Sequence, residues 1–485
     1  MANSDKTATP VNSMPRSSGQ GRALLPIQRV VDLLRMPLLA LATAFVLGAV
    51  VIFLTSGRLE TVGEAYWGLL RGAFLKERGF SESLVAAIPY VFLSLGLAVG
   101  FKTGLFNIGV EGQFYMGAIA AAWAGQAIQG VPTIINLPLV LLAGALGGAI
   151  WAGIPGYLKA KTGAHEVIST MMMNYVAFRL TEFLISGPLR AQGAASTIQT
   201  PRISPGAELW ALWDIPARLA DPLNALGVGL VLGCLAWLIA RAVSRRGQGS
   251  GVRGQAAGGK LQTASGDTQY AIRGTSFVVR HSSLIIAAAV ALLAFLALPP
   301  LTRLWWPFTD RYDRLHLGLV LAVLAAVGVW WLLWKTTVGF ELRTVGANPN
   351  AARYAGMSIT RNVVLGMALS GALAGLAGTV EVVGVSICRC LPLFFSSGYG
   401  FDSIAIALLG RNNPFGILAS AFLFGAMRNG ADLMELSSGV SKYIISLIQA
   451  LVLLFVAAPA VVRWLYRIKG AARADEAPLT RGWGG

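Results

Sequence analysis

Residues 104–117 read GLFNIGVEGQFYMG, a glycine-rich stretch with three polar side chains between two apolar runs. Asn107, Glu111 and Gln113 would each be unfavourable against lipid, which offers no hydrogen-bond partner. A glycine-rich break inside a membrane segment allows a discontinuous helix, and the backbone groups that the break frees must meet protein or water. We therefore expect these side chains to line a path for a polar solute; the alternative is that they only satisfy neighbouring helices.

The composition of the whole chain places this stretch in a membrane protein. Of 485 residues, 55% are hydrophobic and only 13% are charged, whereas about a quarter of the residues are charged in soluble domains. Apolar windows of about 20 residues, enough to cross a hydrocarbon core of about 30 Å, recur along nearly the whole sequence. The sequence predicts an all-α, polytopic helical membrane protein with about 12 spans.

Charge between the spans predicts the orientation. The formal net charge is +17, but the Lys and Arg residues lie mostly between spans rather than in an aromatic-rich groove, so we expect no nucleic-acid partner. With the N-terminus inside, most basic breaks fall on the cytoplasmic side, as the positive-inside rule requires. The predicted spans are residues 36–56, 84–101, 104–127, 134–158, 166–187, 223–242, 282–300, 316–335, 361–386, 398–410, 414–434 and 441–463.

The family resemblance given at the end of this subsection divides the spans into two halves and an insert that contains two of them. A loop at 241–281 in this insert is rich in Gly, Ser, Gln and Arg, which predicts a flexible cytoplasmic segment. Within it GQAAGGKL nearly matches a phosphate-binding loop, but Leu261 replaces the required hydroxyl residue, so we expect no nucleotide or other cofactor. Whether this basic loop contacts anionic membrane lipid stays open. The predicted regions are a cytoplasmic N-terminal tail (1–35), the first transmembrane half (36–200), the insert (201–315), the second transmembrane half (316–465) and a cytoplasmic C-terminal tail (466–485).

Cysteine and histidine are too few for a metal or catalytic site. The three histidines stand far apart near span ends, so we expect no metal. Cys388 and Cys390 are separated by one residue, a spacing that strains a disulfide, so we favour free thiols; the alternative is a bridge, if this break faces an oxidising compartment. No paired nucleophile and base, and no suitable acid dyad, stands at a recognisable spacing. The sequence therefore argues against an intramembrane enzyme.

Two further stretches place polar groups within apolar spans. In HEVISTMMMNYVAFRLTEF, residues 165–183, Asn174 is either an interhelical contact or a solute contact. SSGYGFDSIAIALLGRNNPFG, residues 396–416, repeats the plan of the first stretch: a glycine-rich entry, an acid at Asp402 and a short apolar run. This echo is typical of transporters whose two halves each contribute a broken or short helix to a midplane site. Asp402 is then a path residue or, as we prefer, a helix N-cap.

A short helix is predicted on the cytoplasmic side, in KTTVGFELRTVGANPNAARYAGMSITRN at 335–362. Asn348 followed by Pro349 is a helix start, and Gly356 is a helix stop. About two turns of helix are not stable alone. We therefore expect this helix to be docked on the rest of the protein, where a partner could grip it; a plain connecting loop is the alternative.

Four segments together resemble a known family. GLFNIGVEGQFYMGAIAAAW, EVISTMMMNYVA, TTVGFELRTVGANPNAARYAGMSITRN and GFDSIAIALLGRNNPFGI, in this order, are similar to the permease subunit of bacterial ABC importers in the branched-chain amino acid, simple sugar and nucleoside group. The nucleoside branch, whose binding proteins are basic membrane lipoproteins, fits best. The similarity covers about residues 85–200 and 315–465 and departs from the family pattern between about 205 and 315.

This resemblance implies a fold and a set of partners. The fold would be that of a type II importer permease with inverted repeats, paired with a second, identical or homologous permease. The partners would be two cytoplasmic ATP-binding subunits, which hydrolyse ATP, and an extracytoplasmic solute-binding lipoprotein or periplasmic protein. The coupling helix of the family would lie at 346–357, and the residues that the resemblance assigns to ATPase coupling are Gly346, Asn348, Pro349, Ala351, Ala352, Arg353 and Gly356.

The function that follows is a transport subunit rather than an enzyme. We expect a multi-pass permease of the bacterial cytoplasmic (inner) membrane that forms the path for a small polar solute, with a nucleoside favoured. The path residues would be Asn107, Glu111, Gln113, Asn174 and Asp402. One alternative is an ion-coupled secondary transporter with Glu111 as a titrating carboxylate; another is the same ABC permease carrying a simple sugar.

Overall fold

The computed structural model describes residues 26–193, 198–234, 236–237, 288–300, 302, 307–308, 310–396 and 398–467, and this part of the chain is helical, with two isolated β-bridges. The predicted loop at 241–281 and most of both predicted tails lie outside these residues. The main helices are α1 (Pro26–Ser56), α2 (Leu59–Leu70), α3 (Gly79–Lys102), α4 (Val110–Ala127), α5 (Thr133–Thr162), α6 (Glu166–Ser186), α7 (Ile215–Arg218), α10 (Gly318–Lys335), α11 (Thr337–Ala347), α12 (Pro349–Tyr354), α13 (Ile359–Val380), α14 (Tyr399–Leu409), α15 (Pro414–Ser438), α16 (Tyr443–Ala457) and α17 (Pro459–Leu465).

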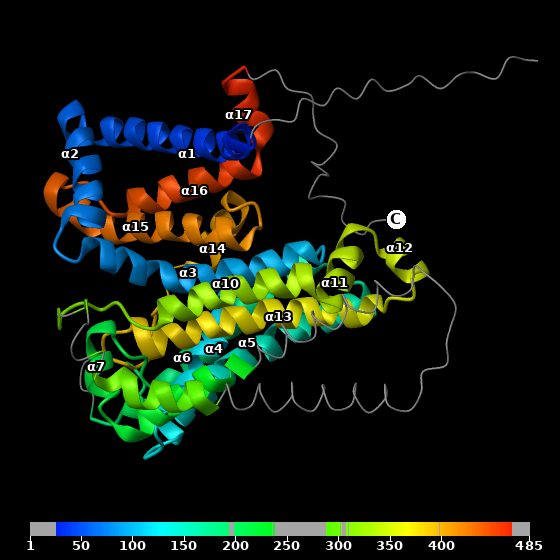
Figure 1. Ribbon diagram of the computed structural model, residues 1–485. Coiled ribbons are helices and arrows are strands. Elements are labelled where there is room, and N and C mark those ends of the chain that lie inside the picture. The colour runs from blue at the N-terminus through cyan, green and yellow to red at the C-terminus, as the bar shows by residue number, and fades with distance from the viewer. Residues whose placement is uncertain are drawn as a thin grey trace, which may run out of the picture.

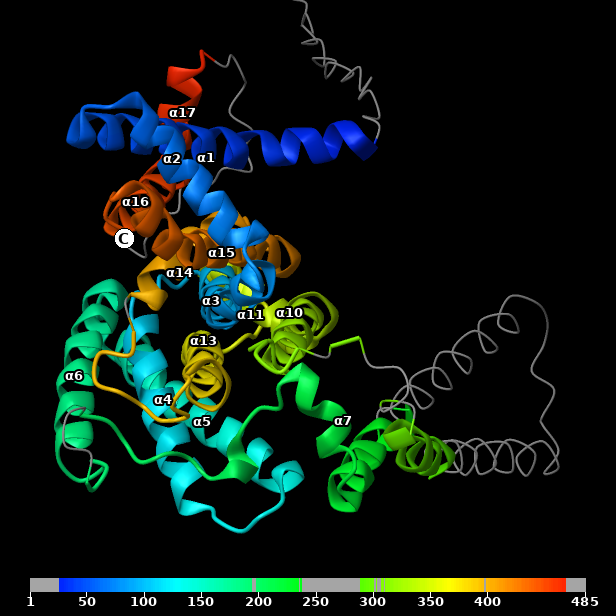
Figure 2. The same cartoon turned by 90° about the vertical axis from the view of Figure 1, so that its left-hand side faces the viewer.

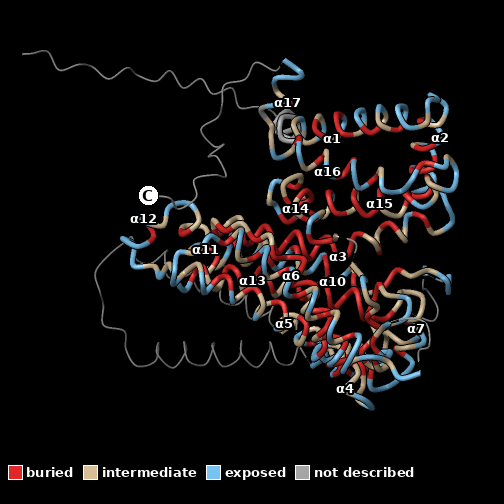
Figure 3. Tube along the Cα trace, turned by 180° about the vertical axis from the view of Figure 1, so that it is seen from behind, coloured by how far each residue is buried: buried red, intermediate tan, exposed pale blue. Residues whose placement is uncertain are grey.

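The central helix of the bundle is α3. It is hydrophobic all round and is buried along almost its whole length, as expected of a helix with no lipid-facing side. It packs against α13 and α10 on one side and against α14 and α15 on the other. Figure 2 looks along the bundle and shows α3 between these groups, and Figure 3 shows its buried path.

Small residues bring α4, α5 and α13 into close contact. A Cβ added to Gly117 of α4 would lie 2.2 Å from the Cα of Gly375 in α13, and one added to Gly148 of α5 would lie 2.1 Å from the carbonyl oxygen of Gly371. Such backbone contact is typical of small-residue helix crossings in membranes. The three helices form one compact unit beside α3 (Figure 1).

The two ends of the bundle agree with the predicted orientation. Figure 1 shows α12 and the start of α1 at one end, and α2 and α7 at the other. Ala160, close to the predicted cytoplasmic lysines at the end of α5, packs on the same small core as Ala352 of α12. The short helix α12 and the start of α1 therefore lie at the same end of the bundle, as the predicted orientation requires.

The predicted count of about twelve spans stays a prediction. Within the described residues, five helices are long and apolar enough to cross a membrane, and a bent pair, Leu212–Arg218 with Pro222–Cys234, makes up to six. The predicted span at 398–410 is only the 11-residue α14, too short to cross alone at about 1.5 Å per residue. The predicted span at 104–127 becomes helical only at Val110.

Other boundaries also need correction. The predicted tail at 26–35 belongs to α1, and the predicted outer break at 57–83 contains α2 and a π-helical turn, η1 (Arg71–Leu75). Cys388 and Cys390, expected as free thiols, form a disulfide with a Cα–Cα distance of 5.1 Å. This separation lies within the usual range for disulfides, so the local turn brings the two residues together despite their short spacing.

Candidate functional site

The candidate site lies where two discontinuous helices meet. The first, α4, begins at Val110 after the turn that follows α3, and the second, α14, begins at Tyr399 after an outer loop. Their N-terminal ends touch, because a Cβ added to Gly400 would lie 2.6 Å from the backbone nitrogen of Glu111. The sequence echo between the two glycine-rich stretches therefore corresponds to a contact in space, as expected for paired half-helices.

Glu111 connects these two helix ends. Its side chain is 2% exposed. One carboxylate oxygen accepts a hydrogen bond from the Ser396 hydroxyl at 2.5 Å, and the other accepts from the backbone N–H of Gly400. A carboxylate is favourable at a helix N-terminus, where free N–H groups carry partial positive charge. Glu111 lies in the first turn of its own helix and caps the other one.

Asn107 and Gln113 hold the turn before α4. Their side-chain amides exchange two hydrogen bonds, of 2.9 and 3.0 Å. Asn107 also donates to the Ser370 hydroxyl of α13 at 2.9 Å and accepts from the N–H of Gly109 at 3.0 Å. Both residues are buried. They satisfy the backbone and each other in this structure, which is the alternative role considered for them.

Asn174 fixes the same turn from α6. Its amide oxygen accepts from the N–H of Gly112 at 2.8 Å, and its amide nitrogen donates to the carbonyl of Ile108 at 3.0 Å. Of its two predicted roles, the interhelical contact is present. The side chain replaces helical hydrogen bonds that α4 lacks at its start.

Asp402 belongs to a second polar cluster beside the helix junction. It is half-buried and accepts a hydrogen bond from the Tyr90 hydroxyl at 2.8 Å, and Arg428 donates to that same hydroxyl at 3.1 Å. The guanidinium of Arg428 also lies 4.0 Å from the centre of the Tyr399 ring, a cation–π contact. Gly398, not Asp402, is the N-cap of α14, so the preferred cap role is wrong.

Aromatic rings surround the junction. The Tyr90 and Tyr399 rings are 4.8 Å apart, and Phe114 stacks on Phe395 at 5.1 Å. Tyr115 contacts Phe395 at 4.6 Å. These rings come from α3, α4, α14 and the outer loop before it, so the junction combines flat apolar faces with carboxylates and one guanidinium.

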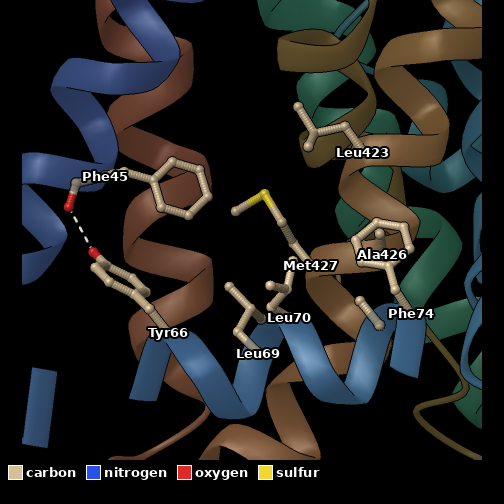
Figure 4. Close-up of a pocket in the computed structure, with 9 residues that line it drawn as sticks. Phe45, Tyr66, Leu69, Leu70, Phe74, Leu423, Ala426 and Met427 are labelled. Carbon is tan, nitrogen blue, oxygen red and sulfur yellow. Dashed lines mark hydrogen bonds between the residues drawn. The ribbon is translucent and has the colours of Figure 1, made fainter. Parts of the chain in front are cut away.

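A separate cavity of about 300 Å³ lies between α1, α2 and α15 (Figure 4). Its lining is apolar apart from the Tyr66 hydroxyl, which already donates to the carbonyl of Phe45 at 2.5 Å. The lining residues are Phe45, Tyr66, Leu69, Leu70, Ala73, Phe74, Leu423, Ala426 and Met427. A polar solute would find almost no partner there, so this cavity does not compete with the junction as a solute site.

The short helix predicted between Asn348 and Gly356 is present. α12 begins at Pro349, and the Asn348 side chain accepts hydrogen bonds from the N–H groups of Asn350 and Ala351, at 3.0 and 3.1 Å. Gly356 ends it with a φ of +78°, in the left-handed region that favours glycine. The helix is docked, because Ala352 is fully buried.

The docking core of α12 reaches the turn before α4. Ala352 packs in a small apolar cluster whose other buried members are Leu105, Val345, Val363 and Met367. Close backbone contact adds to this link, since a Cβ on Gly346 would lie 2.4 Å from the carbonyl oxygen of Lys102. Ala351 and Arg353 are exposed on the other side.

Comparison with known proteins identifies the family. Residues 79–457 match the family described as branched-chain amino acid transport system / permease component. The chain belongs to this permease family. Its relatives include the guanosine ABC transporter permease protein NupP of Bacillus subtilis, 34% identical over 90% of this chain and 97% of the relative. The nucleoside permease NupB of Lactococcus lactis is 28% identical over 92% and 97%, and the glucose permease TsgB13 of Haloferax volcanii is 30% identical over 86% of each chain. No solved structure matches significantly.

Family membership confirms the predicted resemblance and decides between the alternatives. The protein is a membrane permease subunit of an ABC transporter, so the ion-coupled secondary transporter is set aside. Permease subunits of this family are not themselves enzymes, and the family implies ATP-binding and solute-binding partner proteins.

Several residues of the permease site were not predicted. Tyr90, Tyr399 and Arg428 complete the cluster around Asp402. Far from that cluster, Tyr354 on α12 is 94% exposed. Arg428 had a usable signal, because a charged residue within an apolar membrane helix is by default a candidate functional residue. The tyrosines gave no such signal, since aromatic residues are common in membrane spans.

Proposed function

We propose that this permease subunit forms the nucleoside path of an ATP-driven importer in the bacterial cytoplasmic membrane. The observation that carries the proposal is the meeting of α4 and α14, which places two carboxylates, an arginine and stacked aromatic rings around two helix ends. A nucleoside offers a flat base and several hydrogen-bonding groups, which suit such a site. The names of the relatives NupP and NupB support this solute class over a simple sugar.

The path residues then divide by role. Asn107, Gln113 and Asn174 shape the entrance of α4 through their mutual and backbone hydrogen bonds. Glu111 and Asp402 carry the charges at the junction and exchange their present partners for the solute as the path opens. Because the partners are a hydroxyl, a backbone N–H and a phenol, each exchange replaces one hydrogen bond with another of similar strength.

ATP-driven movement would reach this site through α12. ATP-binding subunits that close on α12 would press on the core formed with Leu105, which lies two residues before Asn107. The turn between Leu105 and Val110 carries that displacement to the start of α4. Coupling of this kind needs an element that can adopt two arrangements. The helix break before α4, which is held by side-chain hydrogen bonds, would be that element.

The surrounding assembly follows from the same proposal. Two permease chains, identical or homologous, would share two cytoplasmic ATP-binding subunits, which perform the hydrolysis. An extracytoplasmic binding protein would deliver the solute to the end that carries α2 and α7. Gly346, Asn348, Pro349, Ala352 and Gly356 would build and seat α12, while Ala351 and Arg353 would face the ATP-binding subunit.

Reconstitution of the complete transporter in vesicles tests the proposal. Labelled nucleoside should accumulate only with ATP, the ATP-binding subunits and the solute-binding protein present. Tyr354→Ala should reduce ATP-dependent uptake and binding of the ATP-binding subunit, because exposed tyrosines are frequent interface anchors. The matched control is Tyr443→Ala, since Tyr443 is 75% exposed at the opposite end of the bundle. Accumulation against a gradient by this chain without an ATP-hydrolysing partner would overturn the proposal.

A further inference from the structure

Glu381 is a buried carboxylate that the helix junction does not use. It is the first residue of η4 (Glu381–Val385), the π-helical turn that continues α13. Its side chain is 9% exposed, and its Oε2 atom has no hydrogen-bond partner. Although Glu381 lies near one end of the predicted span at 361–386, it is enclosed by protein.

The other buried glutamates have partners. Glu111 accepts two hydrogen bonds, and Glu166 forms a salt bridge with Lys159 at 3.0 Å. A buried carboxylate oxygen without a partner is unfavourable by roughly 1–3 kcal/mol or more. Since native structures rarely leave a buried polar group unpaired, the unpartnered oxygen indicates a ligand position rather than a packing position.

Glu381 lies close to the proposed solute cluster, because η4 packs against α3 and α4, the helices that carry Tyr90 and Glu111. Arg428 and Arg314 are near enough for their positive charges to act on its carboxylate, and Tyr399 is near enough for its hydroxyl to be affected by the negative charge. Tyr399 and Arg428 are the residues that join Asp402 through Tyr90. Arg314 donates to the carbonyl of Val385 at 2.5 Å and so holds the far end of η4. Glu381 therefore belongs to the same group of charged and aromatic side chains as Tyr399, Asp402 and Arg428.

We propose that Glu381 is a specificity-determining residue that accepts hydrogen bonds from adjacent N–H groups of a nucleobase. This inference rests on the proposed nucleoside function and names the feature of the solute that Glu381 recognises. An ionised carboxylate only accepts hydrogen bonds, and its two oxygens match two neighbouring donors. Guanine presents such a pair, N1–H beside its exocyclic amine, whereas adenine presents an amine beside an acceptor nitrogen. Guanosine is therefore the better solute, and inosine, with one donor, is intermediate.

The variant Glu381→Gln tests this inference in the complete reconstituted transporter. Glutamine has the same shape but turns one acceptor into a donor. The ratio of uptake efficiency, kcat/KM, for guanosine over adenosine should fall about 10- to 100-fold, which corresponds to losing a hydrogen bond to a charged group. Glu182→Gln is the matched control, because Glu182 is an exposed carboxylate on α6 that pairs with Arg179 at 2.7 Å; its ratio should equal that of the native protein.

The outcomes separate this inference from the proposed function. A native transporter that takes up nucleosides, with the same guanosine preference in the Glu381→Gln variant, overturns the role of Glu381 and leaves the function intact. A native transporter that takes up no nucleoside overturns both. If the Gln variant does not assemble, Glu381→Asp, which keeps the acceptor but withdraws it by one methylene, should lower the same ratio. An unchanged ratio in the Asp variant also overturns the proposal.

Discussion

Single glycines decide whether the helices around α13 can approach. Gly148 and Gly153 lie on the same helix, α5, but a Cβ on Gly148 would enter the backbone of α13, whereas one on Gly153 meets nothing within 4 Å. Gly148→Ala should lower the stability of the purified permease by about 1–3 kcal/mol through overpacking. Gly153→Ala should leave it unchanged or slightly raised. Thermal unfolding in detergent measures both, and equal midpoints would contradict the proposed helix crossing.

The capping role of Glu111 can be tested by comparing a Glu111 variant with a variant of one of its two hydrogen-bond donors. Glu111→Ala leaves the Ser396 hydroxyl and the Gly400 N–H without their acceptor, and should destabilise the protein by about 1–3 kcal/mol. Ser396→Ala removes one of these bonds together with its donor, so it should cost about 1 kcal/mol or less. Unfolding midpoints give the comparison. A larger loss in the serine variant than in the glutamate variant would contradict the capping role.

The residue types at the site were predictable, but their partners were not. The composition and the glycine-rich pattern singled out Asn107, Glu111 and Gln113 as polar groups that lipid cannot satisfy. Their acceptors and donors, such as Ser370 and Ser396, stand more than 250 residues away along the chain. No local pattern in one sequence encodes such a contact. The unpartnered state of Glu381 was hidden for the same reason.

At the level of elements, the docked helix α12 has one face that packs on the permease and another that is exposed. Ala352 is fully buried in the core with Leu105, and Ala351 beside it is exposed. Ala352→Leu should destabilise the permease by about 1–3 kcal/mol and disturb coupling. Ala351→Leu should change its stability by less than about 0.5 kcal/mol yet weaken binding of the ATP-binding subunit. Unfolding and pull-down measurements distinguish the two effects, and equal destabilisation by both variants would contradict the docking geometry.

Local signals predicted some elements and missed others. The Asn348–Pro349 start and the Gly356 stop predicted α12, because caps act within one turn. The bounds predicted for the apolar run at 398–410 nearly match α14, but its 11 residues are too few for the complete span that was predicted there. The helix α2 was missed, because its glutamates and glycine resemble a loop between spans. Short amphipathic helices at a membrane surface give weak sequence signals.

At the level of the whole molecule, the disulfide tests the orientation. Cys388 and Cys390 lie in the loop between η4 and α14, which pairs with the backbone of Thr200 and which the predicted orientation places outside. Disulfides persist in oxidising compartments. In a Cys234→Ser background, a membrane-impermeant maleimide should label right-side-out vesicles only after reduction from outside. Labelling only in inverted vesicles would reverse the assigned orientation.

The general architecture was the most predictable part, and the insert the least. Hydropathy and the positive-inside rule predicted an all-helical membrane protein with α12 at the cytoplasmic end. Hydropathy does not tell a half-length helix or a bent pair from a crossing helix, so the predicted count of about twelve spans stays a prediction. Residues 238–287 of the insert lie outside the described part of the chain, so its predicted loop stays a prediction.

The joining of α4 and α14 has an electrostatic consequence for the kind of cargo admitted. Each helix start contributes about half a positive elementary charge, so the pair amounts to roughly one. The Glu111 carboxylate between them supplies one negative charge, and the Asp402 carboxylate and the Arg428 guanidinium, both hydrogen-bonded to Tyr90, offset each other, so the sum of these groups is close to zero. Such a junction would not attract nucleotides, although they share their base and sugar with nucleosides. Discrimination against nucleotides would thus come in part from charges that cancel at the two helix starts.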